Sequence, residues 1–155
     1  MLLNDELQSL KKVPLFAGVP GPKLKLLAFA SDRVNYRPGE ILFREGDVGD
    51  AAYVLLRGRA EVLVGDVGAE SQVAEVGANS IVGEVAILCN VVRTATVRAS
   101  EPVCALRIRK EHFVKLLTDV PEVSVEIVKL LAGRLSATTA ELIVERNRHT
   151  PALQH

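Results

Sequence analysis

Residues 34–108 form a succession of short β-prone runs separated by turns, and this pattern limits the fold more than any other feature of the chain. The runs are Val34-Tyr36, Glu40-Phe43, Ala52-Leu56, Ala60-Val64, Gln72-Val76, Ala95-Ala99 and Val103-Ile108. Turn sequences such as Pro38-Gly39 lie between them. Because no long helices alternate with the runs, a parallel sheet is not indicated, and the spacing predicts a compact antiparallel β-roll.

Both ends of the chain have helical patterns. Leu7 and Leu10 share a helix face, and Pro20-Gly21-Pro22 opens a second helical run. Near the other end, residues 111–118 predict a short helix, and residues 122–147 predict a long one. We therefore expect one mainly β domain with four parts: N-terminal helices over 1–32, a β-roll over 33–109, C-terminal helices over 110–147 and a loose tail over 148–155.

The long C-terminal helix carries a narrow apolar seam with a hydroxyl residue set into it. Its members, at spacings of three and four, are Val128, Leu131, Leu135, Thr138 and Leu142. Such a seam packs against the roll, or it meets a partner helix, a ligand or both. The sequence leaves these alternatives open, and homodimerisation through the Val128 to Leu142 seam is a hypothesis.

Composition excludes several classes of function. The formal net charge is zero, with 19 basic and 19 acidic residues, which argues against a large nucleic-acid footprint and predicts no direct DNA binding. No basic segment followed by an apolar run opens the chain, and no apolar run approaches the ~18 residues of a membrane span. Cys89 and Cys104 suit a reduced compartment, so we expect a cytoplasmic protein. The starting Met1 favours an intact product.

One apolar segment, Glu84 to Cys89, interrupts the β pattern and predicts a short helix between two strands. A glycine before a helix N-terminus lets the backbone approach a ligand closely. The carboxylate of Glu84 is a good acceptor for a sugar hydroxyl. Arg93 supplies a planar charged fork for a phosphate, and Thr94 adds a hydroxyl beside it. Together these residues fit a ligand in which a ribose is joined to a phosphate.

The same segment resembles the phosphate-binding cassette of cyclic nucleotide-binding domains, as found in the catabolite activator protein, cyclic-nucleotide-dependent kinases and gated channels. The matching stretches are Leu15-Val19, Pro38-Asp47, Tyr53-Val62, Gly83-Leu88 and Arg93-Val97. One departure is Val92, where the family usually has proline, which removes rigidity from the loop but no contacting group. The resemblance covers residues from about 10 to 142 and implies a jelly-roll-like double-stranded β-helix, with the cassette over 82–97.

The resemblance also implies a role for each cassette residue. Glu84 would bind the ribose 2′-hydroxyl, and Arg93 would bind the exocyclic phosphate oxygens. The remaining candidates form the cradle around phosphate, sugar and base: Val82, Gly83, Val85, Ala86, Thr94 and Ala95. No metal or cofactor is expected beyond the ligand, cAMP or cGMP.

The base of the ligand is less clearly indicated than its ribose and phosphate. Thr94 indicates acceptance of cGMP, because a hydroxyl at this position of the family can reach the guanine amino group. Residues 132–139 resemble instead the helix of the catabolite activator protein that reaches adenine, which makes Thr138 and Thr139 candidate base contacts and Leu135 a candidate lid. The balance favours cAMP slightly.

The sequence therefore favours a non-enzymatic cyclic-nucleotide sensor that acts on an unidentified effector protein through its C-terminal helix. A second hypothesis is a scaffold that keeps the roll without the ligand, and a third is a sensor fragment of a larger regulator or channel. An enzyme of cupin type needs several histidines on strands, whereas His112 lies in a predicted helix and His149 and His155 in the tail.

Overall fold

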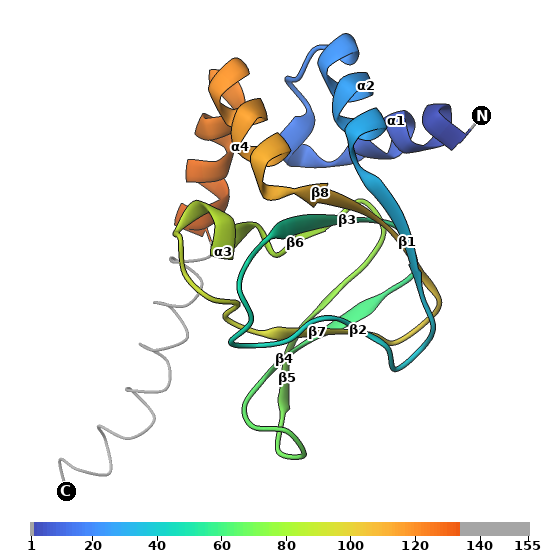
Figure 1. Ribbon diagram of the computed structural model, residues 1–155, viewed down its shortest axis with the longest axis vertical. Coiled ribbons are helices and arrows are strands. Elements are labelled where there is room, and N and C mark those ends of the chain that lie inside the picture. Colours follow the sequence, from blue (N-terminus) through green and yellow to red (C-terminus); the bar gives the residue numbers. More distant parts are fainter. Residues whose placement is uncertain (1, 134–155) are drawn as a thin grey trace, which may run out of the picture.

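The computed structural model, which describes residues 2–133, contains two four-stranded antiparallel sheets that enclose a roll (Figure 1). The strands are β1 (Asp32–Tyr36), β2 (Ile41–Phe43), β3 (Ala51–Arg57), β4 (Ala60–Val64), β5 (Ser71–Val76), β6 (Ile81–Val82), β7 (Thr96–Ala99) and β8 (Val103–Arg109). One sheet has the order β1-β8-β3-β6 and the other β2-β7-β4-β5. The predicted mainly β roll with flanking helices is confirmed.

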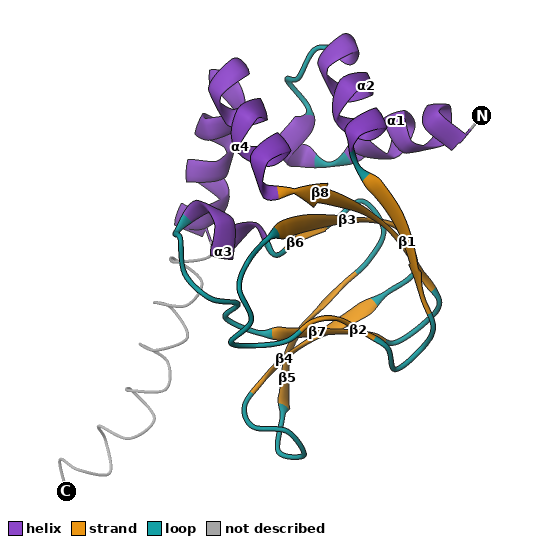
Figure 2. Cartoon of the chain, viewed as in Figure 1, coloured by secondary structure: helices purple, strands orange, loops and turns teal. Residues whose placement is uncertain are grey.

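The helices gather outside the first sheet, and a short one interrupts the strands (Figure 2). They are α1 (Leu2–Lys12), the 3-10 turn η1 (Pro14–Phe16), α2 (Gly21–Ala30), α3 (Glu84–Leu88) and α4 (Lys110–Asp119). A further helix starts at residue 121 and is described as far as residue 133. The expected short helix inside the roll is thus α3, and the break between the two C-terminal helices falls at Val120, where α4 ends before Pro121.

Strand β3 joins the helical layer to the interior of the roll. Six of its seven residues are buried in succession, because a covered sheet presents both of its faces to apolar neighbours. Alternate residues serve different cores. Val54 packs into the cluster under the helices together with Phe16 and Phe113, whereas Tyr53 and Leu55 pack into the cluster between the sheets.

Two details of the strands differ from the sequence pattern. Strand β6 has two residues, which is too short to produce an alternation that a sequence reveals. In residues 60–64, strict alternation predicts that Leu63 lies on the face opposite Ala60. In the structure Ala60 and Leu63 are both buried, but the unbroken register of β4 with β7 shows that the alternation along β4 is kept. The β-bulge of this hairpin lies in β5, where Val73 has no partner between Ala74, opposite Val62, and Gln72, opposite Leu63.

Strand β5 lies at the edge of its sheet and has little contact with either core. Its first five residues are exposed, and it pairs on one side with β4. The β4–β5 hairpin projects away from the helices, at the opposite end of the molecule (Figure 1).

A prediction follows from Gly58, at the turn between β3 and β4. Its φ of +92° is in the left-handed region, and a Cβ there would lie 2.2 Å from the Pro102 carbonyl oxygen. We expect Gly58→Ala to lower the free energy of unfolding by about 2 kcal/mol or more. The matched control is Gly77→Ala, where no atom lies within 4 Å of the added Cβ. Equal urea midpoints for the two variants would contradict this prediction.

Candidate functional site

The predicted cassette begins where β6 ends at Val82, and Gly83 forms the N-cap of α3 with φ 84°. A Cβ at this position would lie 2.6 Å from Arg93 Nη1 and 3.1 Å from Phe43 Cε2. Glycine is therefore required both by the left-handed backbone and by the close approach of two side chains. The close approach seen here is that of protein side chains, and the predicted approach of a ligand to this backbone stays a prediction.

Glu84 is the first residue of α3, and its side chain is almost fully buried, with 2% of the residue exposed. A carboxylate in the first turn of a helix is favoured by the unpaired N–H groups there. The helix packs closely against the chain that enters β3, since a Cβ at Gly49 would lie 2.4 Å from the Cβ of Ala86. Gly49 thus permits α3 to hold Glu84 inside the roll.

The guanidinium of Arg93 is buried directly beside this helix start, with 2% of the residue exposed. Nη1 donates to the Gly83 carbonyl oxygen at 2.8 Å, and Nη2 donates to the Ala51 carbonyl oxygen at 2.7 Å. Asp50 Oδ1 lies 3.5 Å from Nη2. Burial lowers the pKa of Arg93, while Tyr53 and Asp50 oppose this shift, and an arginine remains charged under these conditions.

Two further contacts define the environment of Arg93. The Cζ atom of its guanidinium lies 4.2 Å from the centroid of the Phe43 ring, within the range of a cation–π interaction. Nε is buried and has no acceptor among the described residues. A buried N–H without an acceptor costs about 1–3 kcal/mol, so this donor is suited to an anionic ligand oxygen.

Backbone hydrogen bonds hold the loop between α3 and Arg93 against residues 46–48. The amide of Arg93 donates to the Asp47 carbonyl at 2.7 Å, and its carbonyl accepts from the amide of Gly46 at 2.8 Å. Val92 forms an antiparallel bridge with Val48. Main-chain pairing therefore restrains this loop, where Val92 stands in place of the family's usual proline.

Asp50 connects the cassette arginine to a row of charged side chains on the β1-β8-β3-β6 sheet. Its Oδ2 lies 2.9 Å from Arg107 Nη2, and Arg107 Nη1 lies 3.6 Å from Asp32. Asp32 in turn pairs with Arg109, the N-cap of α4, at 3.1 Å. Arg107 and Arg109 thus both have acidic partners on this surface.

The structure brings together most of the predicted site residues. Val82 and Ala86 are buried, Val85 and Ala95 are half-buried, and Thr94 is exposed beside Arg93. The predicted base contacts Leu135, Thr138 and Thr139 lie outside the described residues, as does most of the predicted seam. Of the described part of the seam, Val128 is 65% exposed and Leu131 packs against the helical core.

Sequence reasoning missed three residues that contact Arg93. They are Phe43, Asp50 and Ala51, and two of them act through an aromatic face or a main-chain carbonyl. The glycine and aspartate before a buried strand, Gly49 and Asp50, were the signal available for part of this set.

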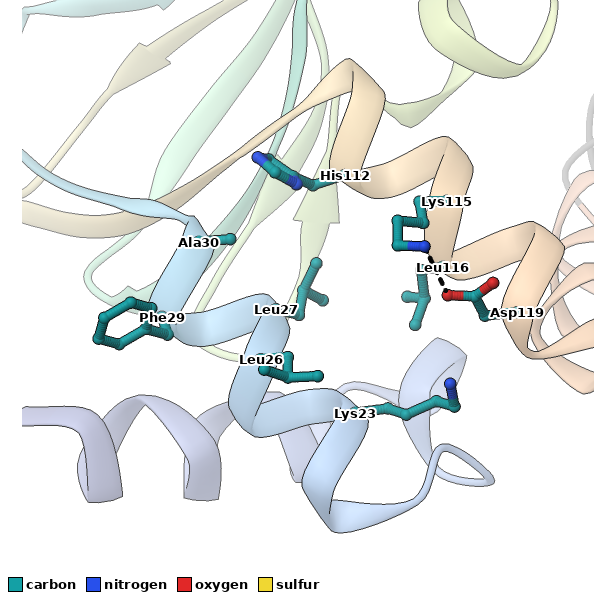
Figure 3. A pocket seen from close by; sticks show the side chains of 9 residues that line it. All are labelled: Lys23, Leu26, Leu27, Phe29, Ala30, His112, Lys115, Leu116 and Asp119. Carbon is teal, nitrogen blue, oxygen red and sulfur yellow. Dashed lines mark ion pairs between the residues drawn. The ribbon is translucent and has the colours of Figure 1, made fainter.

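Two surface pockets lie away from the cassette. One is a largely apolar groove between α2 and α4, where Leu27 and Leu116 lie between Lys23 and His112 (Figure 3). The other is lined by Arg33, Asn35, Tyr36, Arg57, Pro102, Val103 and Cys104. Neither contains a residue of the cassette, so the chemistry of the predicted site is separate from both.

The comparisons with known proteins agree with this geometry. A family model described as cyclic nucleotide-binding domain matches residues 33–119, which include the whole cassette. The chain belongs to the cyclic nucleotide-binding domain family. Domains of this family have regulatory rather than catalytic roles. The match therefore confirms the resemblance seen in the sequence.

Individual relatives include channels and kinase subunits. The chain is 32% identical to the potassium channel GORK of Arabidopsis thaliana over 70% of its own length, and 30% identical to a cAMP-dependent protein kinase regulatory subunit of Blastocladiella emersonii over 74%. These matches span 13% and 28% of the two relatives. The catabolite activator protein of Thermus thermophilus is similar in structure, with TM-score 0.76 and 29% identity over 84% of this chain and 62% of that one.

Two negative findings apply to residues 2–133. None of the helices there is long and apolar enough to cross a membrane. Nor do three or more His, Cys, Asp or Glu side chains come together there as ligands for a metal ion.

Tyr36 is the last residue of β1 and lines the second of these pockets. Its environment predicts how the stability of the fold depends on pH. Burial, together with neighbouring Tyr53, raises the pKa of Tyr36 from 10.0 to about 12. Between these values the folded protein keeps a proton that the unfolded chain loses, so this tyrosine makes stability fall as pH rises through that window. We expect an ultraviolet phenolate titration to show a late step that Tyr36→Phe removes. If Tyr36→Phe instead removes a titration step near pH 10, burial does not raise the pKa of Tyr36.

Proposed function

We propose that this chain is a sensor that binds a cyclic nucleotide, with cAMP as the preferred ligand, and that it needs no metal or other cofactor. The observation that carries the proposal is that the side chains of Glu84 and Arg93 are both buried at the start of α3, next to Gly83. A buried carboxylate opens α3, and a buried guanidinium donates to the carbonyl of the residue before it. Membership of the family makes a ribose phosphate the natural ligand for this pair.

In this proposal each group of the ligand has its own receptor. The ribose 2′-hydroxyl donates to Glu84, and the phosphate oxygens accept from Arg93, whose Nε has no acceptor among the described residues. Backbone groups at Gly83, Ala86 and Thr94 complete the phosphate cradle. Val82, Val85 and Ala95 enclose the sugar and the near edge of the base.

The base contacts rest on the sequence resemblance. Thr138 and Thr139 contact adenine, and Leu135 covers it, which favours cAMP. Thr94 supplies a hydroxyl for a guanine amino group, so cGMP is a second ligand. The exposure of Thr94 beside the buried Arg93 is compatible with this role.

Ligand binding is transmitted by moving the C-terminal helix, since a ligand shifts a conformational equilibrium only through contacts that differ between the two states. The ion pairs from Arg93 through Asp50, Arg107 and Asp32 to Arg109 connect the cassette to the start of α4, the helix that precedes the C-terminal helix. The partner is an effector protein or a second copy that meets the Val128 to Leu142 seam, without direct DNA binding. A cytoplasmic location suits such a sensor.

The chain has no catalytic activity in this proposal. One relative, the lysophospholipase nte1 of Neurospora crassa, is an enzyme, but the match spans 8% of its length. The alternatives are a ligand-free scaffold with the same roll and a sensor segment of a larger regulator or channel. Binding measurements separate the first alternative from a sensor of either kind.

The proposal predicts that the isolated chain binds cAMP, measured by calorimetry, and that cAMP raises its melting temperature. Arg93→Lys keeps the charge but loses the planar fork, so we expect affinity to fall by about tenfold or more. Glu84→Gln should weaken binding in the same direction. The control is Arg98→Lys, whose arginine pairs with Glu61 at 2.8 Å outside the cassette. Parent-like affinity in both cassette variants would refute the site, and a parent that binds no cyclic nucleotide would favour the scaffold.

Base selectivity gives a separate prediction. Thr94→Ala removes the hydroxyl proposed for the guanine amino group, so cGMP affinity should fall by about 3- to 10-fold, as for loss of one hydrogen bond. The affinity for cAMP should stay within about twofold of the parent. Thr94→Ser serves as the control that keeps the hydroxyl. Equal losses for the two nucleotides would contradict a role in base selection.

A further inference from the structure

The ring of Phe43 and the guanidinium of Arg93 form a stack inside the cassette. Phe43 ends β2, on the sheet opposite β3, and its ring lies 4.2 Å from Arg93 Cζ. The same ring also meets Tyr53, with centroids 5.7 Å apart and planes inclined by 35°. The arginine is therefore held between main-chain acceptors at its nitrogen atoms and an aromatic face.

Gly83 makes this stack possible. A Cβ at residue 83 would lie 3.1 Å from Phe43 Cε2 and 2.6 Å from Arg93 Nη1, so any other residue would press on both partners. The missing side chain leaves room for the ring and the cation together. Gly83, Phe43 and Arg93 thus form one packed unit drawn from three separate segments of the chain.

The stack accounts for how a long side chain stays in one position while part of it has no protein partner. Nη1 and Nη2 have carbonyl acceptors, but Nε is buried without one among the described residues. A cation over an aromatic face is attracted more strongly when both are removed from water. The Phe43 ring supplies this attraction at Cζ, and Nε keeps its hydrogen-bonding capacity.

We propose that Phe43 is the positioning residue of the phosphate-binding arginine, an inference that rests on the proposed function. The ring does not contact the phosphate. It raises affinity by increasing the fraction of unliganded molecules in which Arg93 already has its binding geometry. In a loop with Val92 in place of proline, this side-chain restraint complements the main-chain pairing with residues 46–48.

Two replacements test the stack. Phe43→Leu keeps an apolar side chain without a ring, and 3,4,5-trifluorophenylalanine at position 43 keeps the shape of the ring but withdraws electrons from its face. We expect calorimetry to show about 3- to 10-fold weaker binding of cAMP to Phe43→Leu, the range of a modest cation–π interaction, and a loss in the same direction for the fluorinated ring. The matched control is trifluorophenylalanine at Phe16, which is buried in the helical core.

Adenosine, which has no phosphate, distinguishes positioning of Arg93 from general damage to the roll. Its affinity, measured by competition with cAMP, should be equal in the parent and both Phe43 variants. Side-chain resonances of Arg93 should also lose an upfield ring-current shift in Phe43→Leu. Equal losses for cAMP and adenosine would overturn the proposal, as would parent-like cAMP affinity with the fluorinated ring.

A double-mutant cycle in the unliganded protein keeps this inference separate from the proposed function. Phe43→Leu and Arg93→Met should be non-additive in urea denaturation, because each removes the cation–π contact. Additive effects would overturn the stack even if cAMP binds. A parent that binds neither nucleotide, together with a non-additive cycle, would refute the proposed function and the ligand role of Phe43 while leaving the stack as a structural contact.

Discussion

The buried charge of Arg93 is the constraint around which this end of the roll is organised. Removing a guanidinium from water is costly unless its donors are satisfied, and here two carbonyl oxygens from separate segments accept from it. The start of β3, the start of α3 and the end of β2 are therefore arranged around one cation. Because the same group is the proposed phosphate receptor, the binding site is also part of the framework that holds the sheets together.

The layers themselves are held by apolar packing rather than by the charges on the surface. Exposed ion pairs contribute about 0–1 kcal/mol each, and Asp50 and Arg109 are largely exposed. Burial along β3 is continuous and serves both cores. A displacement of β3 would therefore disturb the roll interior and the helical layer at once, and this strand begins at the carbonyl that accepts from Arg93.

The sequence was sufficient for the features that local patterns specify. Turn residues and β-prone runs predicted the roll, and an apolar interruption predicted α3 with Glu84 at its start. Features that depend on tertiary contacts were not predictable. The β-bulge at Val73 of β5 depends on how that strand pairs with β4, and the stacking of Phe43 on Arg93 joins residues 50 positions apart. A main-chain acceptor such as the Ala51 carbonyl carries no signal in residue identity at all.

The position of the β4–β5 hairpin bears on where the chain tolerates an insertion. Its edge strand is exposed along most of its length and projects from the end of the roll remote from the helices (Figure 1). Few interactions would be lost if the connection at residues 65–70 were lengthened, and loop closure becomes only slowly more costly as a loop grows. This hairpin is thus the natural attachment point for a fluorescent reporter, because cargo placed there would leave the cassette and the helical layer undisturbed.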